Sequence, residues 1–444
     1  MILTEKEVKK ILEKIISFSK ADSVTVNLAG ADRYNIRIAR NSQTTSGFED
    51  SLTVSVTSNF GNRSGTFSSG YGNIDSLKEI VRRSEEIAKL SPENREFIAP
   101  PGKQIYQPAK NFSLNTEKLT NNQRTELLSY IIERSVETGV ITAGYYEDGL
   151  SFDSVINSNG LFAYNLSSRA EFSATSRTKD QTGSSRVRSV NVDYNKLNYR
   201  YYTDKLINRA LLSSVPKELK PGKYTVILEP FATADMVSRL LSFMNSRQAD
   251  EGRSYFSSPT GGNKIGIKIL DEEVTIYSDP SDDIAPSIPF TDDGYPRNKV
   301  IWFENGILRN LHRNPYWAAK TSQEIIPYPS NLIMSGTDKT IDQIISETDY
   351  AILVTRLWYI RTVESKTMLL TGLTRDGLFE VRDGKISGPV KNFRFNESPV
   401  NVFSNIIEIG KTEITAGSET GSFSIAAPPV KVKDFNFTSL SDAI

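Results

Sequence analysis

The chain holds very few of the side chains that bind zinc or act as nucleophiles. It has one histidine, His312, and no cysteine in 444 residues. A catalytic zinc site takes three protein ligands, usually histidines with a carboxylate or a thiolate. The sequence therefore excludes an ordinary zinc peptidase or a cysteine hydrolase built from this chain alone. His312 lies in the loop-like segment Asn310–Pro315, where we expect it to pack against its neighbours rather than act as a base.

Acidic residues form several short clusters that could in principle bind magnesium or calcium. None has the regular spacing of a calcium loop, and all lie in turn-like sequence, so we expect solvated loops. The clusters are Asp250-Glu251, Asp271-Glu272-Glu273, Asp282-Asp283 and Asp292-Asp293. Ser17 and Lys20 match a Ser-x-x-Lys nucleophile pattern, but the companion motifs of such enzymes are absent from the chain. A stand-alone hydrolase based on a carboxylate–magnesium site or on a serine remains an alternative hypothesis.

The charge balance gives no sign of a polyanionic partner. Lysine plus arginine number 53 and aspartate plus glutamate also number 53. A neutral chain has no overall field to attract nucleic acid or an acidic membrane surface. The start of the sequence lacks a basic segment followed by an apolar run, and we expect a cytoplasmic protein with neither a nucleic-acid nor a membrane partner.

Two similar series of elements are expected in the first half of the chain. A capping box at Thr4 and Glu7 and another at Thr120 and Gln123 each precede an amphipathic helix. Short strands and a further helix follow in each case, and the proline-rich segment 91–118 reads as a linker between the two units. The shared order suggests an internal duplication. The expected strands are 24–28, 35–40, 52–58, 140–146, 151–157 and 169–176, and the closing helix of the second unit is 204–212.

The second half reads mainly as strands and turns after one helix. A buried strand at Tyr224–Leu228 precedes an apolar helix that carries Met236 and Leu240. Strands segregated from helices indicate an α+β fold. We expect an N-terminal unit (1–100), a central unit (101–216) and a β-rich C-terminal domain (217–444) with a large antiparallel sheet. The expected strands are 265–270, 274–277, 299–303, 352–356, 367–373 and 378–382.

The most distinctive stretch is residues 369–398, LLTGLTRDGLFEVRDGKISGPVKNFRFNES. It predicts strand, turn, strand, a tight turn at Asp383-Gly384, and a further strand. A meander of this kind can offer an edge to an extended peptide, which would bind by adding a strand. Interior sheet without any ligand is the competing interpretation.

This stretch resembles the C-terminal part of the TldD/PmbA family, once named for a supposed modulation of DNA gyrase. Asn73–Leu77, leading into a helix that ends at Glu86-Ile87-Ala88, is similar to the family's N-terminal region. Pro329–Gly336 resembles its Pro-x-Asn-Leu segment. The resemblance spans nearly the whole chain and is strongest in residues 325–400.

In that family the TldD subunit is a zinc peptidase with a His-Glu-x-x-x-His helix and a later cysteine ligand. Its relative TldE, or PmbA, lacks these groups and pairs with TldD to enclose a chamber for unfolded or small peptides. The resemblance places the metal-motif positions near Ser238, Arg239 and Phe243, and the cysteine near Thr415-Ala416. Every ligand is absent there, so the resemblance implies the metal-free TldE/PmbA side.

The resemblance therefore implies a non-catalytic subunit of a cytoplasmic TldD–TldE-type metallopeptidase. It would bind peptide and help to form the chamber, while zinc would come from a TldD-like partner. We expect a heterodimer with that partner, or a homodimer in its absence. A stand-alone homodimeric peptide-binding or scaffold protein without protease activity is the alternative. Arg375 and Asp376 are our candidates for contact with peptide, with an ordinary turn salt bridge as the competing interpretation.

Overall fold

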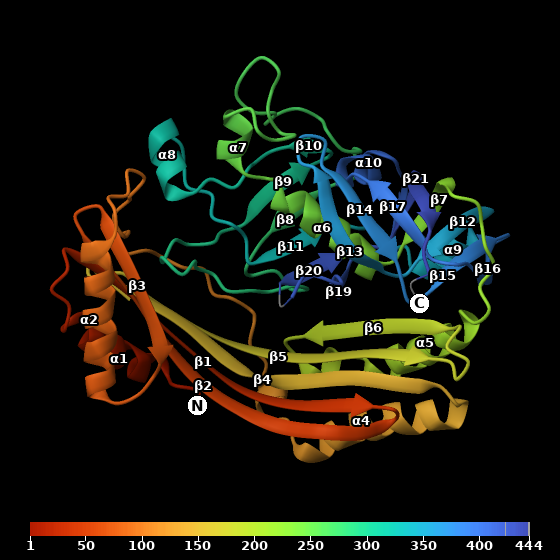
Figure 1. Ribbon diagram of the computed structural model, residues 1–444, viewed down its shortest axis with the longest axis horizontal. Coiled ribbons are helices and arrows are strands. Elements are labelled where there is room, and N and C mark those ends of the chain that lie inside the picture. The colour runs from red at the N-terminus through yellow and green to blue at the C-terminus, as the bar shows by residue number, and fades with distance from the viewer. Residues whose placement is uncertain (422, 443–444) are drawn as a thin grey trace.

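The computed structural model describes residues 1–421 and 423–442. One long six-stranded sheet and its helices form the N-terminal half, and two further sheets form the C-terminal half, as Figure 1 shows. The α+β prediction is confirmed. Within the described part of the chain, no helix has both the length and the apolar character needed to span a membrane.

The N-terminal sheet is antiparallel throughout and has the order β3-β2-β1-β4-β5-β6. Its four central strands are far longer than the short strands that the sequence predicts. Strands β1 and β4 each join two predicted segments, and β2 and β5 each extend beyond one. A two-residue turn at Arg40-Asn41, with positive φ angles of 51° and 60°, connects β1 to β2. The strands are β1 (Ser23–Ala39), β2 (Ser42–Phe60), β3 (Arg63–Gly70), β4 (Ile141–Asn157), β5 (Phe162–Arg177) and β6 (Ser184–Asn191).

The sheet contains two units with the same order of elements, helix, three strands, helix, that meet at the β1–β4 pair. Both predicted capping boxes are present, since Thr4 and Thr120 exchange hydrogen bonds with Glu7 and Gln123. The strand order is symmetrical about β1 and β4, as an internal duplication would require. The helices are α1 (Glu5–Ile16), α2 (Ile74–Leu90), α4 (Asn121–Thr138) and α5 (Tyr199–Leu212), with short α3 (Leu114–Glu117) and η1 (Tyr194–Lys196).

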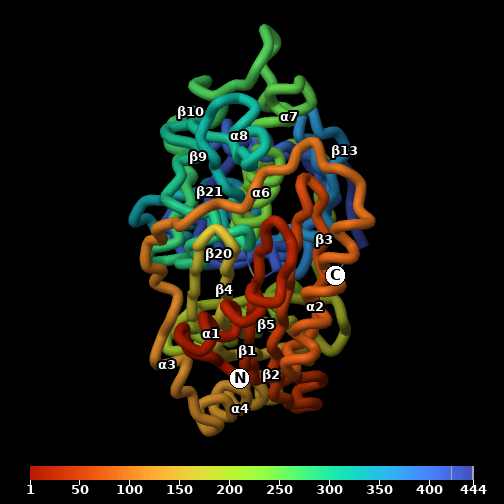
Figure 2. The backbone as a smooth tube through the Cα atoms, turned by 90° about the vertical axis from the view of Figure 1, so that its left-hand side faces the viewer, coloured from red at the N-terminus to blue at the C-terminus, as the bar shows by residue number. Residues whose placement is uncertain are grey.

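Residues 91–113 connect the two units without regular structure, as the proline-rich composition predicts. Figure 2 shows this segment as an orange tube that crosses the C-terminal half before it returns to α3. The linker therefore contacts both halves of the molecule. The expected boundaries at residues 100 and 216 remain predictions, although strands from both sides of residue 100 share one sheet.

The C-terminal half contains two mixed sheets rather than one antiparallel sheet. The larger has the order β13-β14-β17-β21-β7-β12-β15-β16, with β18 also paired to β21, and the smaller has the order β10-β9-β8-β11-β20-β19. The β7–β12 and β11–β20 pairs are parallel. The larger sheet comprises β7 (Gly222–Leu228), β12 (Tyr350–Val354), β13 (Leu357–Glu364), β14 (Leu369–Thr374), β15 (Leu378–Arg382), β16 (Lys385–Pro389), β17 (Phe393–Glu397), β18 (Ile406–Ile409) and β21 (Val430–Leu440).

Helix α6 (Pro230–Ser242) follows β7 and lies in the core shared by the two C-terminal sheets. Most of its residues, including Ala232–Val237, Leu240 and Leu241, are buried, so core surrounds most of the helix. The smaller sheet comprises β8 (Ile276–Ser278), β9 (Val300–Glu304), β10 (Ile307–Leu308), β11 (Asn331–Met334), β19 (Glu413–Thr415) and β20 (Ser424–Ala427). The remaining helices are α7 (Ser246–Asp250), α8 (Pro315–Thr321), α9 (Ile341–Ser346) and α10 (Pro399–Ser404).

Two local predictions in this half are wrong. Residues 265–270 form turns instead of a strand, since Gly266 has a φ of +89° and Ile265 and Ile267 are exposed. The predicted meander in residues 369–398 is only partly formed. The Asp383-Gly384 turn does join β15 to β16, with φ angles of 48° and 74°, but β14 pairs with β13 and β17 instead of β15.

Candidate functional site

The start of α6 is anchored to the N-terminal half by a buried group of charges. Glu229 precedes α6, is 4% exposed, and forms ion pairs with Arg209 and Lys205 of α5. Burial alone would raise the pKa of Glu229, but the two cations outweigh it and lower the pKa to about 2. This group fixes α6 relative to α5 and so to the long sheet.

The three positions expected for the degenerate metal motif carry structural contacts. Ser238 donates a hydrogen bond from Oγ to the carbonyl oxygen of Asp235 at 3.0 Å, and Phe243 packs against the core. Arg239 forms an ion pair with Glu419, and Glu419 is also 3.1 Å from Arg361 of β13. Two guanidinium groups on one carboxylate thus occupy the region to which the resemblance assigns metal ligands.

Asp235 is a further acidic residue of α6 that sequence reasoning missed. Its side chain lies against the 416–421 loop, where Oδ1 accepts a 3.5 Å hydrogen bond from the N–H of Glu419 and Oδ2 has no partner. Burial raises the pKa of Asp235 to about 7, although the backbone N–H groups of Ser418 and Glu419 act in the opposite direction. A Cβ atom on Gly417 would lie 2.3 Å from Oδ1, so the close approach needs glycine. A lone acid within the largely apolar stretch Pro230–Val237 was the available signal.

Arg375 and Asp376 lie at the junction of the two halves. Asp376 is 3% exposed, forms an ion pair with Arg356, and accepts a 2.7 Å hydrogen bond from the Ser184 hydroxyl of β6. Arg375 is 4.0 Å from the same carboxylate and faces the ring of Trp358. Asp376 is thus engaged inside the protein, and its proposed contact with peptide stays a prediction.

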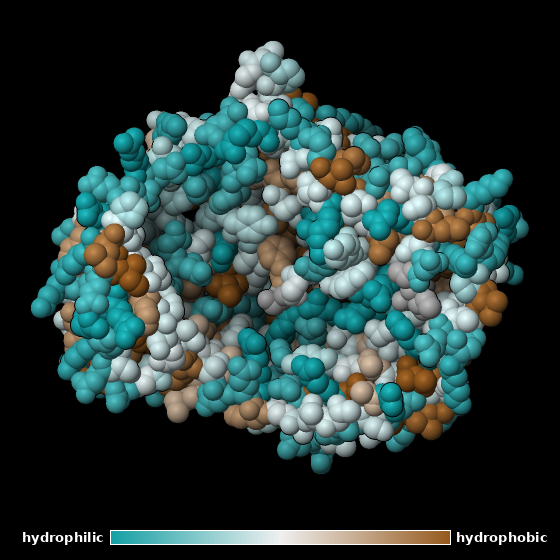
Figure 3. Space-filling model, in the orientation of Figure 1, coloured by the Kyte–Doolittle hydropathy of each residue, from teal (hydrophilic) through white to brown (hydrophobic). Residues whose placement is uncertain are grey.

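A deep cleft lies between the long sheet and the C-terminal half. Two cavities of about 840 and 800 Å³ meet at Ala29, Asp153 and Asp292, which line both. Figure 3 shows the hollow on the surface between the two parts of the molecule. We call this space the interdomain cleft. Other lining residues include Arg33, Ile98, Phe290, Arg297, Tyr316, Tyr328 and Phe423.

Two acidic residues from distant parts of the chain, Asp153 and Asp292, line the interdomain cleft and interact electrostatically. Burial and the nearby carboxylate of Asp292 raise the pKa of Asp153 to about 6, while Arg297 and Arg33 act to lower it. Arg297 donates to the backbone oxygens of Tyr328, at 3.0 Å, and Phe290. The cleft therefore combines acidic, basic and aromatic groups around a space wide enough for an extended peptide.

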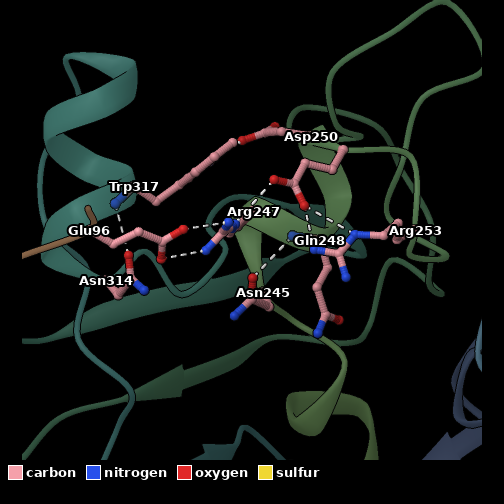
Figure 4. Close-up of polar contacts among 9 residues, drawn as sticks. Glu96, Asn245, Arg247, Gln248, Asp250, Arg253, Asn314 and Trp317 are labelled. Atoms are coloured by element: carbon pink, nitrogen blue, oxygen red, sulfur yellow. Dashed lines mark hydrogen bonds and ion pairs between the residues drawn. The ribbon is translucent and has the colours of Figure 1, made fainter. Parts of the chain in front are cut away.

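The linker lines part of the interdomain cleft and is held there by contacts with the C-terminal half. Arg247 of α7 forms two 2.8 Å hydrogen bonds with Glu96, and its guanidinium lies over Tyr316 and Trp317 of α8. The Trp317 indole donates to Asp250 at 2.7 Å. Figure 4 shows Glu96, Arg247, Asp250 and Trp317 together. The linker thereby becomes a wall of the cleft.

The remaining sequence candidates have structural partners. His312 Nδ1 is 2.8 Å from the carbonyl oxygen of Ile326, and burial lowers the pKa of this histidine. Ser17 donates to the carbonyl oxygen of Lys14 at the end of α1. The four acidic clusters make internal contacts, such as Asp283 with Lys110 and Asp282 with Tyr277. Among residues 1–421 and 423–442, no three His, Cys, Asp or Glu side chains are grouped to hold a metal ion.

Comparisons with known proteins point to one class. Residues 221–439 match the family described as the PmbA/TldA metallopeptidase C-terminal domain. A Metalloprotease TldD homolog of Buchnera aphidicola is 23% identical over 374 residues, 76% of this chain and 74% of that protein. Metalloprotease MJ0996 of Methanocaldococcus jannaschii is 20% identical over 332 residues, 71% of this chain and 70% of that protein.

The fold agrees with these matches. The crystal structure of TldE from Thermococcus kodakarensis superposes with a TM-score of 0.84 and 16% identity, covering 97% of this chain and 99% of that one. Fold and sequence together define a metallopeptidase-related α+β protein. The chain belongs to the TldD/PmbA family.

The residues of this chain do not fit the metal ion that the name metalloprotease implies for its relatives. The single imidazole, His312, lies against a backbone carbonyl oxygen in the loop before α8. Ser238 and Phe243 stand near the positions of the two motif histidines, and Arg239 near that of the glutamate. A hydroxyl, a guanidinium and a phenyl ring are a poor donor set for zinc.

Proposed function

We propose that the chain is the metal-free, TldE/PmbA-like subunit of a cytoplasmic TldD–TldE-type metallopeptidase that acts on unfolded or small peptides. The observation that carries the proposal is the Arg239–Glu419–Arg361 group at the position expected for the metal motif. A cation there would repel a metal ion as well as fail to bind it. Zinc and the general base would then come from a partner chain.

The interdomain cleft supports a role in peptide binding. Its aromatic walls suit apolar side chains, and its polar groups suit the backbone and the termini of a peptide. Joined to a partner that carries the zinc site, this cleft would form one wall of the chamber. The chain would contribute substrate binding and shape, and we assign it no catalytic step of its own.

Purification of the tagged chain from its native cells tests the proposal. We expect a stable one-to-one complex with a chain that carries His-Glu-x-x-x-His, with zinc in the complex. A control variant, Arg200→Gln, removes an exposed pair with Glu126 and contacts with the rings of Tyr130 and Tyr199, and should purify with the same partner. A homodimer that contains no hydrolase would instead support the alternative, a peptide-binding or scaffold protein without protease activity.

A further inference from the structure

A second pocket lies on the same face of the long sheet as the interdomain cleft, farther along the strands, and shares no lining residue with the cleft. Tyr146, Phe172 and Val187 pack in a core with α4 and α5, and Figure 1 shows these helices along the sheet. Side chains alternate along a strand, so their neighbours point to the opposite face. These neighbours and nearby residues line a cavity of about 560 Å³, which we call the arginine pocket: Arg37, Thr44, Tyr145, Ser173, Thr175 and Arg186.

The pocket exists because its floor carries small side chains between two long ones. Ala143, Gly144, Ser173 and Thr175 leave the space open. The pairings Arg37–Tyr145, Tyr145–Ser173 and Thr175–Arg186 place the two arginines on strands β1 and β6. Three strand spacings separate those strands, roughly 14 Å. Two extended arginines can thus approach one small ligand from opposite sides.

Both arginines lack a carboxylate partner within 4 Å in the described part of the chain. Arg186 donates to the Thr175 hydroxyl at 3.1 Å, and its buried Nε has no acceptor. Burial, together with the charges of Arg356 and Arg188, lowers the pKa of Arg186 to about 10. A desolvated guanidinium without an acceptor is unfavourable, and an anion in the pocket would offset that cost.

The acidic groups nearest the pocket are already engaged. Tyr145 donates to Glu147 at 2.7 Å, and Arg188 pairs with Glu171 at 2.6 Å. Asp376, whose charge favours the cationic form of Arg186, is bound by Arg356. The protein therefore supplies hydroxyl groups and one aromatic ring around the two cations, but keeps its own carboxylates elsewhere.

We propose that the arginine pocket binds the C-terminal carboxylate of a peptide, with the terminal side chain on the floor of small residues beside Tyr145. A guanidinium matches the two oxygens of a carboxylate in a paired geometry. This inference rests on the proposed peptide-binding function and adds an end-specific anchor to it. The anchor lies outside the interdomain cleft, so it would hold one end of a peptide while the cleft holds another part.

Fluorescence anisotropy with one labelled hexapeptide, as the free acid and as the C-terminal amide, tests the inference on the full chain. We expect the amide to bind roughly 10- to 100-fold more weakly, the loss typical of a charge-assisted hydrogen bond. Arg186→Gln and Arg37→Gln should each weaken binding of the acid toward the level of the amide and leave the amide unaffected. Arg37 is exposed, so its variant keeps the test valid where the Arg186 variant fails to fold.

Arg200→Gln removes the same charge from the opposite side of the sheet and should leave the difference between acid and amide unchanged. Equal binding of acid and amide would overturn the inference while the proposed peptide binding stands. Binding of neither peptide would overturn both. Acetate that competes as effectively as the peptide acid would identify a small-anion site and would also overturn the inference.

Discussion

The charged group that anchors α6 predicts a large and pH-dependent effect of Glu229→Gln. Glu229 is 6% exposed at its side chain, and its partners Arg209 and Lys205 are 15% and 19% exposed. Removal of one member of a buried ion pair leaves the others uncompensated and typically costs about 3–5 kcal/mol. The displacement of the Glu229 pKa from 4.5 to about 2 independently corresponds to about 3 kcal/mol.

The same displacement fixes the direction of the pH dependence. A carboxyl group whose pKa is lower in the folded state contributes stability above its unfolded pKa, and this contribution is lost as the pH falls. The free-energy difference between the natural chain and Glu229→Gln should therefore be full above about pH 4.5 and shrink toward pH 2. Subtracting the free energy of unfolding of Glu229→Gln from that of the natural chain removes the contribution of every other acidic residue.

Urea unfolding followed by circular dichroism at several pH values measures both effects. The control is Glu126→Gln, which breaks the ion pair between Glu126 of α4 and Arg200 of α5. The two side chains of this pair are 58% and 56% exposed. Exposed pairs contribute about 0–1 kcal/mol, so this variant should stay close to the natural chain. A Glu229→Gln variant no less stable than the control at pH 7 would refute the reasoning.

Three further predictions concern single sites. The pKa of Asp235 is raised from 3.8 to about 7, so ionisation of this carboxyl destabilises the fold increasingly from pH 4 to pH 7. The Asp235→Asn variant should therefore be more stable than the natural chain above pH 7, by up to about 4 kcal/mol. Gly149→Ala should destabilise the long sheet by about 1–3 kcal/mol, because the new Cβ would lie 1.9 Å from the Asp32 carbonyl oxygen. Asp376→Asn leaves Arg356 without its buried partner and should cost about 3 kcal/mol.

Thermal and urea unfolding at pH 5 and pH 8 check all three. Equal stability of Asp235→Asn and the natural chain at pH 8 would contradict the raised pKa of this buried acid. An undisturbed Gly149→Ala would show that β1 and β4 can separate locally. A neutral effect of Asp376→Asn would mean that the junction does not depend on this ion pair.

Local features of the fold were readable from the sequence because they depend on neighbours in the chain. Thr4 and Thr120 each identify a helix start through a partner three residues away. Asp383-Gly384 identifies a hairpin through its own backbone preference. The strand order was not readable, since β14 and β15 lie close in sequence but β17, β21, β7 and β12 lie between them in the sheet.

The candidate site was harder to predict for the same reason. Asp153 and Asp292 are far apart in the sequence and meet only because the C-terminal half packs over the long sheet. Asp292 was visible as part of an acidic cluster, but its partner lies within a strand. The scarcity of metal ligands, in contrast, needs no fold to be recognised, because one histidine and no cysteine are counted directly.

Zinc analysis combined with a peptidase assay tests the central claim most directly. Two samples would each be given an unfolded peptide: the purified chain supplied with zinc, and the chain mixed with a TldD-type partner. The control is the chain mixed with a partner that lacks its motif histidines. We expect neither stoichiometric zinc nor peptide hydrolysis for the chain alone. We expect stoichiometric zinc and peptide hydrolysis for the mixture with the intact partner. Stoichiometric zinc and peptide cleavage by the chain alone would contradict it.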